Sequence, residues 1–260
     1  MKTLLKQILK YYLKYITKLV LAIYRPLIIG VSGSINVIFT KEEIKRQLEA
    51  AGLAARFNPK NFNTEIGLPL AILNLPSGYN SYKSWPPIIW RAFKSIFYLK
   101  LPKILVLGLG VSDPGDMKYL MSLVKPDIGV ITDITQRYIE SFDDMDKLVG
   151  EYEIFTKAIK KNGYLILNYD NPRLRQLAQT VNQATIFFGL GKAGSGLKNY
   201  WRGEIIEKTT TGQIIRVTDE RQAASYQVNR FGQHHVYARL TGLIVKKIVL
   251  NFKTGSRQRL

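Results

Sequence analysis

The chain has 260 residues, of which 38 are Lys or Arg and 19 are Asp or Glu, so its formal net charge is 38 − 19 = +19. Apolar residues make up 46% of the sequence, which is enough for a buried core and excludes a mainly disordered chain. Cysteine is absent and the two histidines are His234 and His235, so disulfides, thiolate metal sites, cysteine nucleophiles and a histidine-rich metal centre are excluded. A basic globular protein of this kind is expected to attract an anionic partner.

Residues 1–25 form a segment of their own, in which lysines recur every four residues with Leu, Ile and Tyr between them (Lys2, Lys6, Lys10, Lys14 and Lys18). At about 100° per residue, these lysines sweep about 160° of a helix and leave the rest of its surface apolar. The uncharged run 19–24 is far below the ~20 residues that span a bilayer, and no cleavable signal peptide is evident. Two interpretations stay open: a helix docked on its own domain or on a partner, and an in-plane amphipathic helix on an anionic membrane.

After Pro26, short apolar strands alternate with amphipathic helices. The pattern predicts helices over 44–53 and 116–124, and strands at 27–31, 104–109, 128–131, 164–167 and 185–188. Continuous apolar strands that alternate with helices are typical of an α/β fold whose mainly parallel sheet is covered on both faces.

The remaining segments complete the predicted organisation. Residues 76–102 are aromatic and irregular, and we expect a partly helical insertion there. Residues 200–228 alternate around Thr211-Gly212 and predict a β-hairpin, and 240–252 predicts a closing helix. The expected organisation is therefore a basic helix over 1–25, one domain over 26–252 and a basic tail over 253–260.

The first strand leads through the small-residue loop 30–36 into a helix, which is the layout of a phosphate-binding loop. In such a loop the backbone N–H groups at the helix start face an anion. A working P-loop continues with Gly-Lys-Ser/Thr, where the Lys contacts phosphate and the hydroxyl binds Mg²⁺. Here those three places hold Asn36, Val37 and Ile38, which supply neither the charge nor the Mg²⁺ ligand.

Six blocks of the sequence together resemble the central, ATP-binding domain of the Mur ligase family, most closely the members that add D-alanyl-D-alanine to UDP-N-acetylmuramoyl-tripeptide. They occur in the family's order and roughly its spacing across residues 27–250: the loop 30–41, NTEIGLP at 63–69, PGD at 114–116, KPDIGVIT at 125–132, NYDNP at 168–172 and GQHHVY at 232–237. The resemblance implies a P-loop-type parallel sheet and an enzyme that uses ATP and Mg²⁺ to form an amide through an acyl-phosphate. It also implies two further domains, which this sequence does not cover.

The resemblance carries a remnant nucleotide site onto eight residues: Gly30, Ser32, Gly33, Ser34, Asn36, Asn168, Asp170 and His234. A structural interpretation stays open for each kind of residue. The glycines would form a tight strand-to-helix turn, Asn168 and Asp170 would cap a strand end, and His234 would make a contact at a helix start.

The departures from the family fall on its catalytic positions. The family's Mg²⁺-binding Glu aligns with Gly108, and its metal-associated His aligns with Tyr138 in the motif that starts at Asp133. Its carbamylated Lys falls near Glu151 or Tyr152, where a Glu would imitate the negative charge of the carbamate. The Asn residues of the last motif are replaced by His235 and Ala238. We therefore assign no catalytic residue and no metal ligand.

The sequence predicts a degenerate Mur-ligase-like domain, a pseudoenzyme that acts as a binding or scaffold protein in cell-wall (peptidoglycan) precursor synthesis. Its expected partners are a ligase subunit, or the membrane surface through residues 1–25. The alternative is an ATP-dependent amide-forming ligase domain with residual activity or with a partner subunit, so whether the chain is an enzyme stays open. A nucleic-acid binder is disfavoured, because the basic residues are dispersed and no known module is recognisable. The expected location is cytoplasmic, at the inner face of the membrane if the helix binds lipid, and no oligomeric state is predicted.

Overall fold

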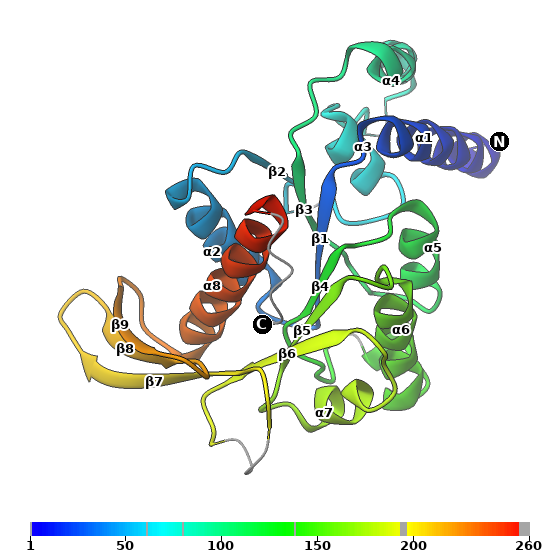
Figure 1. The fold of residues 1–260 in the computed structure, drawn as a ribbon. Helices are drawn as coiled ribbons and strands as arrows, with labels where there is room; N and C mark the ends of the chain where they lie inside the picture. The colour runs from blue at the N-terminus through cyan, green and yellow to red at the C-terminus, as the bar shows by residue number, and fades with distance from the viewer. Residues whose placement is uncertain (1, 61, 80, 138, 193–196, 255–260) are drawn as a thin grey trace.

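A computed structural model of the chain describes residues 2–60, 62–79, 81–137, 139–192 and 197–254, and within these ranges nine strands form one sheet (Figure 1). Their order is β2-β3-β1-β4-β5-β6-β7-β8-β9; neighbours from β2 to β7 are parallel, and β8 and β9 continue the sheet antiparallel. The parallel α/β sheet predicted from the sequence is confirmed. The strands are β1 (Leu27–Ser32), β2 (Ala55–Phe57), β3 (Ile104–Gly108), β4 (Ile128–Ile131), β5 (Tyr164–Asn168), β6 (Ala184–Gly189), β7 (Tyr200–Lys208), β8 (Gln213–Thr218) and β9 (Ala223–Val228).

Helices cover both faces of the sheet (Figure 1). On one face, α2 (Val37–Ala50) and α8 (Gln233–Thr254) pack on strand residues such as Ile29. On the other face, strand residues such as Ile28 contact three helices: α5 (Asp116–Leu123), α6 (Met145–Ala158) and α7 (Pro172–Ala178). Successive strand side chains point to opposite faces, and both faces are buried here, which explains why β1 is an uninterrupted apolar run.

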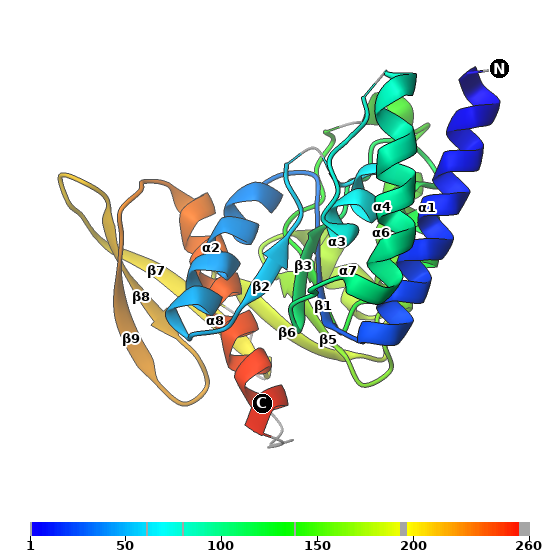
Figure 2. The ribbon, with the colours of Figure 1, turned by 90° about the horizontal axis from the view of Figure 1, so that it is seen from above.

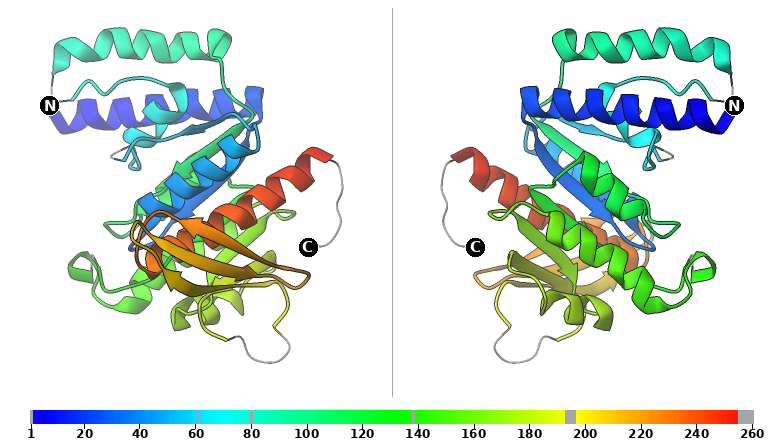
Figure 3. Two further views of the ribbon diagram at one scale, coloured as in Figure 1. Left: turned by 90° about the vertical axis from the view of Figure 1, so that its left-hand side faces the viewer. Right: turned by 90° about the vertical axis from the view of Figure 1, so that its right-hand side faces the viewer.

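A third, smaller core holds the N-terminal helix on the molecule. Leu13 and Val20 of α1 (Lys2–Tyr24) are fully buried, and they pack with Ile88 of α4 (Trp85–Tyr98) and with Leu70 of α3 (Gly67–Leu73). Figures 2 and 3 show α1 and α4 lying side by side, on the opposite side of the molecule from β7, β8 and β9. The docked interpretation of the first 25 residues therefore holds for one side of this helix, and the helical insertion predicted within 76–102 is confirmed as α4.

The boundaries of several elements differ from the prediction. The closing helix was expected from residue 240, yet α8 begins at Gln233. Its first turn contains the polar pair His234 and His235, which interrupts the apolar periodicity on which the prediction rests. The helix expected over 44–53 ends at Ala50, and Gly52 then turns the chain with φ 66°. The expected hairpin gains a third strand, β9, and residues 255–260 of the expected basic tail lie outside the described residues. Two short 3₁₀ turns complete the fold, η1 (Tyr82–Ser84) and η2 (Ile139–Ser141).

Candidate functional site

The backbone of the candidate phosphate loop has the shape that the sequence predicts. Gly33 has φ 145°, and a Cβ built there would lie 2.1 Å from Thr132 Oγ1, so only glycine fits without rearrangement. Asn36 is the N-cap of α2 and lies in the left-handed region, with φ 66° and ψ 0°. Asparagine is among the non-glycine residues that tolerate this conformation best. Strand, loop and helix start therefore follow one another in the predicted arrangement.

The two serine hydroxyls of the loop are used inside the protein. Ser32 is fully buried, and its Oγ donates to Leu109 O at 2.9 Å. Ser34 is 6% exposed; its Oγ accepts from Thr135 N at 3.1 Å and lies 3.4 Å from the hydroxyl of Tyr152. These hydrogen bonds fasten the loop to the ends of β3 and β4 and to α6.

Gly30 lies inside β1 and three residues before the turn at Gly33. A Cβ at Gly30 would meet Pro126 at 3.0 Å and Phe155 at 3.1 Å, so its role is close packing of α6 on the strand. At the other end of the loop, Ile38 in the first turn of α2 leaves 41% of its surface exposed. An apolar side chain therefore stands where the family resemblance expects a Mg²⁺-binding hydroxyl.

A lysine lies beside Gly108, the position that the family resemblance aligns with a Mg²⁺-binding Glu. Lys41 of α2 donates from Nζ to both O and Oδ1 of Asn58, each at 2.6 Å, and Asn58 Oδ1 also accepts from Gly108 N at 2.7 Å. A Cβ at Gly108 would lie 3.0 Å from Cδ and 3.2 Å from Nζ of Lys41. Burial lowers the pKa of Lys41 to about 8. Sequence reasoning missed this contact because nothing in the spacing of residues 41, 58 and 108 brings them together.

The hydrogen bonds of α6 settle which of two neighbouring residues faces the loop. Glu151 accepts from Gly115 N at 2.7 Å and from Met117 N at 2.8 Å, so its carboxylate caps the N-terminus of α5. Tyr152 is the residue that faces the loop, at Ser34. The expectation that Glu151 imitates the carbamate charge is therefore wrong, because its carboxylate is directed at α5.

The residues at the end of β5 hold neighbouring loops together. Asn168 is 3% exposed, and its Oδ1 accepts from Asp170 N at 3.0 Å, which is the strand-end cap interpretation. The carboxylate of Asp170 accepts from Leu190 N at 2.6 Å and from the hydroxyl of Tyr237 in α8 at 2.9 Å. Burial and this hydrogen bond raise the pKa of Tyr237. Asp170 thus joins the ends of β5 and β6 to α8.

The stretch after β4 is tied to the N-terminus of α7. Asn171 caps α7 with its Oδ1, which accepts from Arg173 N at 3.0 Å and from Leu174 N at 3.2 Å. Its Nδ2 donates to Ile134 O at 3.0 Å and to the carboxylate of Asp133. Burial raises the pKa of Asp133, and the bond from Asn171 opposes that shift. Tyr138, which the resemblance aligns with the family's metal-associated His, lies outside the described residues.

The two histidines pack beside the helix that follows the loop. The ring of Phe39 lies 4.9 Å from the rings of both His234 and His235. Burial, together with His234 and Arg230 nearby, lowers the pKa of His235 to about 4, so this imidazole is neutral at pH 7. The fold therefore places His234 at the start of α8 against Phe39 of α2, which is the helix-start contact of the structural interpretation, and its contact with a nucleotide stays a prediction. A cavity of about 330 Å³ opens here between α2, β9 and α8, lined by Phe39, Glu43, Arg46, Arg230, His235 and Arg239 among others.

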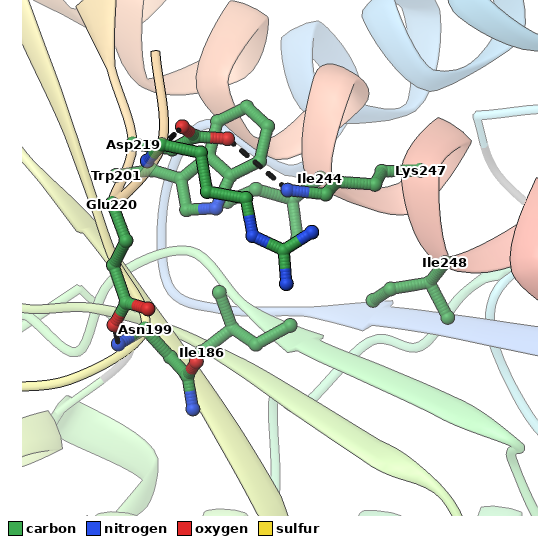
Figure 4. A pocket seen from close by; sticks show the side chains of 9 residues that line it. Ile186, Asn199, Trp201, Asp219, Glu220, Ile244, Lys247 and Ile248 are labelled. Carbon is green, nitrogen blue, oxygen red and sulfur yellow. Dashed lines mark hydrogen bonds and ion pairs between the residues drawn. The ribbon is translucent and has the colours of Figure 1, made fainter. Parts of the chain in front are cut away.

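Two other observations bear on what the chain holds. Within the residues that the structure describes, no group of three or more His, Cys, Asp or Glu side chains is placed to hold a metal ion. A second pocket lies between β6, β7 and α8, away from the phosphate loop, where Lys247 and Asp219 form an ion pair at 3.1 Å (Figure 4). Its volume of about 20 Å³ suits a single water molecule, not a cofactor.

Curated relatives match most of this chain but only part of their own length. The UDP-N-acetylmuramoyl-tripeptide–D-alanyl-D-alanine ligase of Mycobacterium leprae is 24% identical over 216 residues, which cover 80% of this chain and 37% of the relative. The enzyme of the same name from Haemophilus influenzae is 23% identical over 234 residues, with 88% and 45% covered. The chain thus spans less than half the length of these two relatives.

Solved structures show the same fold. The MurF ligase of Thermotoga maritima, in complex with ADP, superposes with a TM-score of 0.74 at 20% identity and covers 96% of this chain and 53% of that one. MurF from Acinetobacter baumannii gives a TM-score of 0.68 at 15% identity, with 96% and 47% covered. Residues 91–245 match the family model described as the Mur ligase middle domain. With more than half of its length matched, the chain belongs to the Mur ligase family.

Proposed function

We propose that this Mur-ligase-like domain has lost ATP-dependent ligation and acts as a binding or scaffold protein in the synthesis of peptidoglycan precursors. The contact between Lys41 and Gly108 is the observation that carries the proposal. A Cβ at Gly108 would lie 3.0 to 3.2 Å from Lys41, so a carboxylate there would have to displace a lysine that two hydrogen bonds to Asn58 hold in place. A protonated lysine beside the loop repels a divalent cation instead of replacing its ligand.

The side chains at the helix start support the same conclusion. Val37 and Ile38 offer no charge to a triphosphate and no oxygen to Mg²⁺. Phosphoryl transfer depends mostly on positioning and electrostatic stabilisation, and the loss of one such contact costs about 10²–10³ in rate. The residues present therefore do not fit ATP with Mg²⁺ in the way the family resemblance implies. We assign no step of ligation to them.

One observation favours the alternative, a domain that keeps ATP-dependent ligase activity with the help of a partner subunit. The loop backbone has positive φ angles at Gly33 and Asn36, as a tight strand-to-helix turn requires, and the Thermotoga maritima structure that shares this fold contains ADP. Backbone N–H groups at a helix start attract phosphate without any side chain. Nucleotide binding and ligation are therefore separate questions for this chain.

Calorimetric titration of the full chain with ATP and ADP, with and without MgCl₂, separates the two functions. The wild-type chain is expected to show no Mg²⁺-dependent binding. A Val37→Lys variant restores a cation at the helix start, and we expect it to bind nucleotide weakly without requiring Mg²⁺, because Gly108 still offers no carboxylate. A Mur ligase with an intact loop is the positive control. Micromolar, Mg²⁺-dependent ATP binding to the wild-type chain would contradict the loss of ligation and support the alternative.

The scaffold role has its own test. Two relatives are ligases that act on UDP-N-acetylmuramoyl-tripeptide, so a ligase of that kind is the proposed partner. Light scattering of the chain mixed with such a ligase from the same organism is expected to show a complex. If light scattering of the mixture shows only the masses of the two separate proteins at high micromolar concentration, the scaffold role with this partner is wrong.

A further inference from the structure

The side of α1 that faces away from the third core is apolar and uncovered. Buried residues such as Leu13 and Val20 point inward, whereas a stripe at spacings of three and four residues remains 46–65% exposed. At about 100° per residue, such a stripe forms one continuous face of a helix. Its members are Leu4, Ile8, Tyr11, Tyr15, Leu19 and Ile23.

The uncovered face continues from α1 onto α4. The hydroxyl of Tyr12 donates to Ile89 O at 3.0 Å, so the two helices meet at this edge of the stripe. Next to that contact α4 exposes Trp90 at 58%, Phe93 at 43% and Phe97 at 64%. The open apolar hollow between the helices measures about 470 Å³ and is lined by Tyr12, Pro86, Ile89, Trp90 and Phe93. We call these exposed residues of α1 and α4 the apolar face.

Cationic residues border the apolar face on both outer sides. On α1, Lys10, Lys14 and Lys18 follow the side toward α5, where Lys10 Nζ lies 4.1 Å from the ring centroid of Tyr119. Burial, followed by repulsion from Lys18 and Lys10, lowers the pKa of Lys14, so this row is crowded with like charges. On α4, Arg91 and Lys94 are exposed on the opposite border. Neither helix contains Asp or Glu, although the chain has 19 acidic residues.

We infer that the apolar face, with its two cationic borders, is a peripheral binding surface for a bilayer that contains anionic lipid. Trp and Tyr favour the membrane–water interface, and lysine side chains reach from an in-plane helix to anionic headgroups. Within the described residues no helix is long and apolar enough to cross a membrane, so the fitting arrangement has α1 and α4 lying in the plane of the interface. A second copy of the chain is a poorer occupant, since it would bring two sets of cationic borders together. This inference is independent of whether ATP binds.

Sedimentation with vesicles tests the inference on the full chain. We expect it to sediment with vesicles of phosphatidylcholine and phosphatidylglycerol, weakly with phosphatidylcholine alone, and less as salt is raised. The emission of exposed Trp90 should shift to the blue on binding, and a Trp90→Phe variant should lose that shift. Phe93→Ser with Phe97→Ser, and separately Lys18→Glu with Lys94→Glu, are expected to lower the partition coefficient by at least about tenfold.

Control variants make the same kinds of substitution at exposed sites elsewhere on the surface. Phe231 is 49% exposed and distant in the fold, so Phe231→Ser should bind like the wild type. Lys161→Glu with Lys208→Glu makes the same charge change on other exposed sites and should also bind. No sedimentation, or equal binding by the apolar-face variants and their controls, would overturn the inference. So would a dimer, seen by light scattering, that the Phe93 and Phe97 changes abolish, because a second copy would then cover the face.

Discussion

Glu151→Ala tests whether this carboxylate is a structural cap or a remnant of a metal site. Glu151 is 7% exposed and accepts from Gly115 N at 2.7 Å and Met117 N at 2.8 Å. A hydrogen bond to a charged group contributes about 1.5–3 kcal/mol. Gly115 is exposed and its N–H can turn to water, whereas Met117 is fully buried and keeps an unsatisfied donor. The expected loss of unfolding free energy is therefore about 3 kcal/mol.

Thermal and urea unfolding measure this loss. For a chain of this size 1 kcal/mol lowers Tm by roughly 2–4 °C, so Glu151→Ala should melt roughly 6–12 °C below the wild type. Glu151→Gln keeps one acceptor and should lose about half as much. Glu153→Ala is the control on the same helix: its partner Lys157 lies 3.2 Å away on the surface, so the change should cost less than about 1 kcal/mol. If Glu151→Ala melts with the wild type, or if Mg²⁺ stabilises the wild type and not this variant, the capping role is refuted.

Three further outcomes follow from the same geometry. Gly33→Ala should destabilise the fold by about 2–4 kcal/mol in urea unfolding, because the new Cβ meets Thr132 and φ is positive there. In the same assay Gly150→Ala, in the open middle of α6, should stabilise the fold by about 0.5–1 kcal/mol. The pKa of Lys41 is about 8 in the folded chain against 10.5 unfolded, so the unfolded chain binds more protons between these values and stability should rise with pH over 8 to 10. Lys41→Met should flatten that rise. The pKa of His235 is about 4 in the folded chain against 6.5 unfolded, so the stability should fall as pH drops from 6.5 to 4. Urea titrations at each pH should show that His235→Gln removes this part of the fall.

The sheet was predictable because its strands carry a strong local signal. A strand buried on both faces is apolar throughout, and β4 was predicted with the observed bounds, 128–131. Shorter elements carry too few residues for periodicity to show, and the prediction gave no position for β2, α3 or α7, with 3, 7 and 7 residues. The prediction also gave no position for α6, although it has 14 residues, because the spacing of its apolar residues was not distinguished from that of the loop before it.

The site was less predictable, because its contacts join distant parts of the chain. Lys41 meets Gly108 only because β1 pairs with β3, with Val31 opposite Gly108, so that α2 starts beside the end of β3. The choice between Glu151 and Tyr152 could not be made from aligned spacing alone. Adjacent residues on a helix point about 100° apart, so a shift of one position exchanges the side toward α5 for the side toward the loop.

The glycine pattern of the loop reports a local folding requirement and does not by itself indicate nucleotide binding. Gly33 is required whether or not a nucleotide binds, because Thr132 occupies the space of its Cβ and Thr132 Oγ1 donates to Ile35 O at 2.6 Å. The left-handed residue at position 36 is likewise required to start α2 after the turn. Both features report how the first strand enters the first sheet-covering helix. The proposed loss of ligation depends instead on the side chains at positions 37, 38 and 108, where this member of the Mur ligase family carries Val, Ile and Gly.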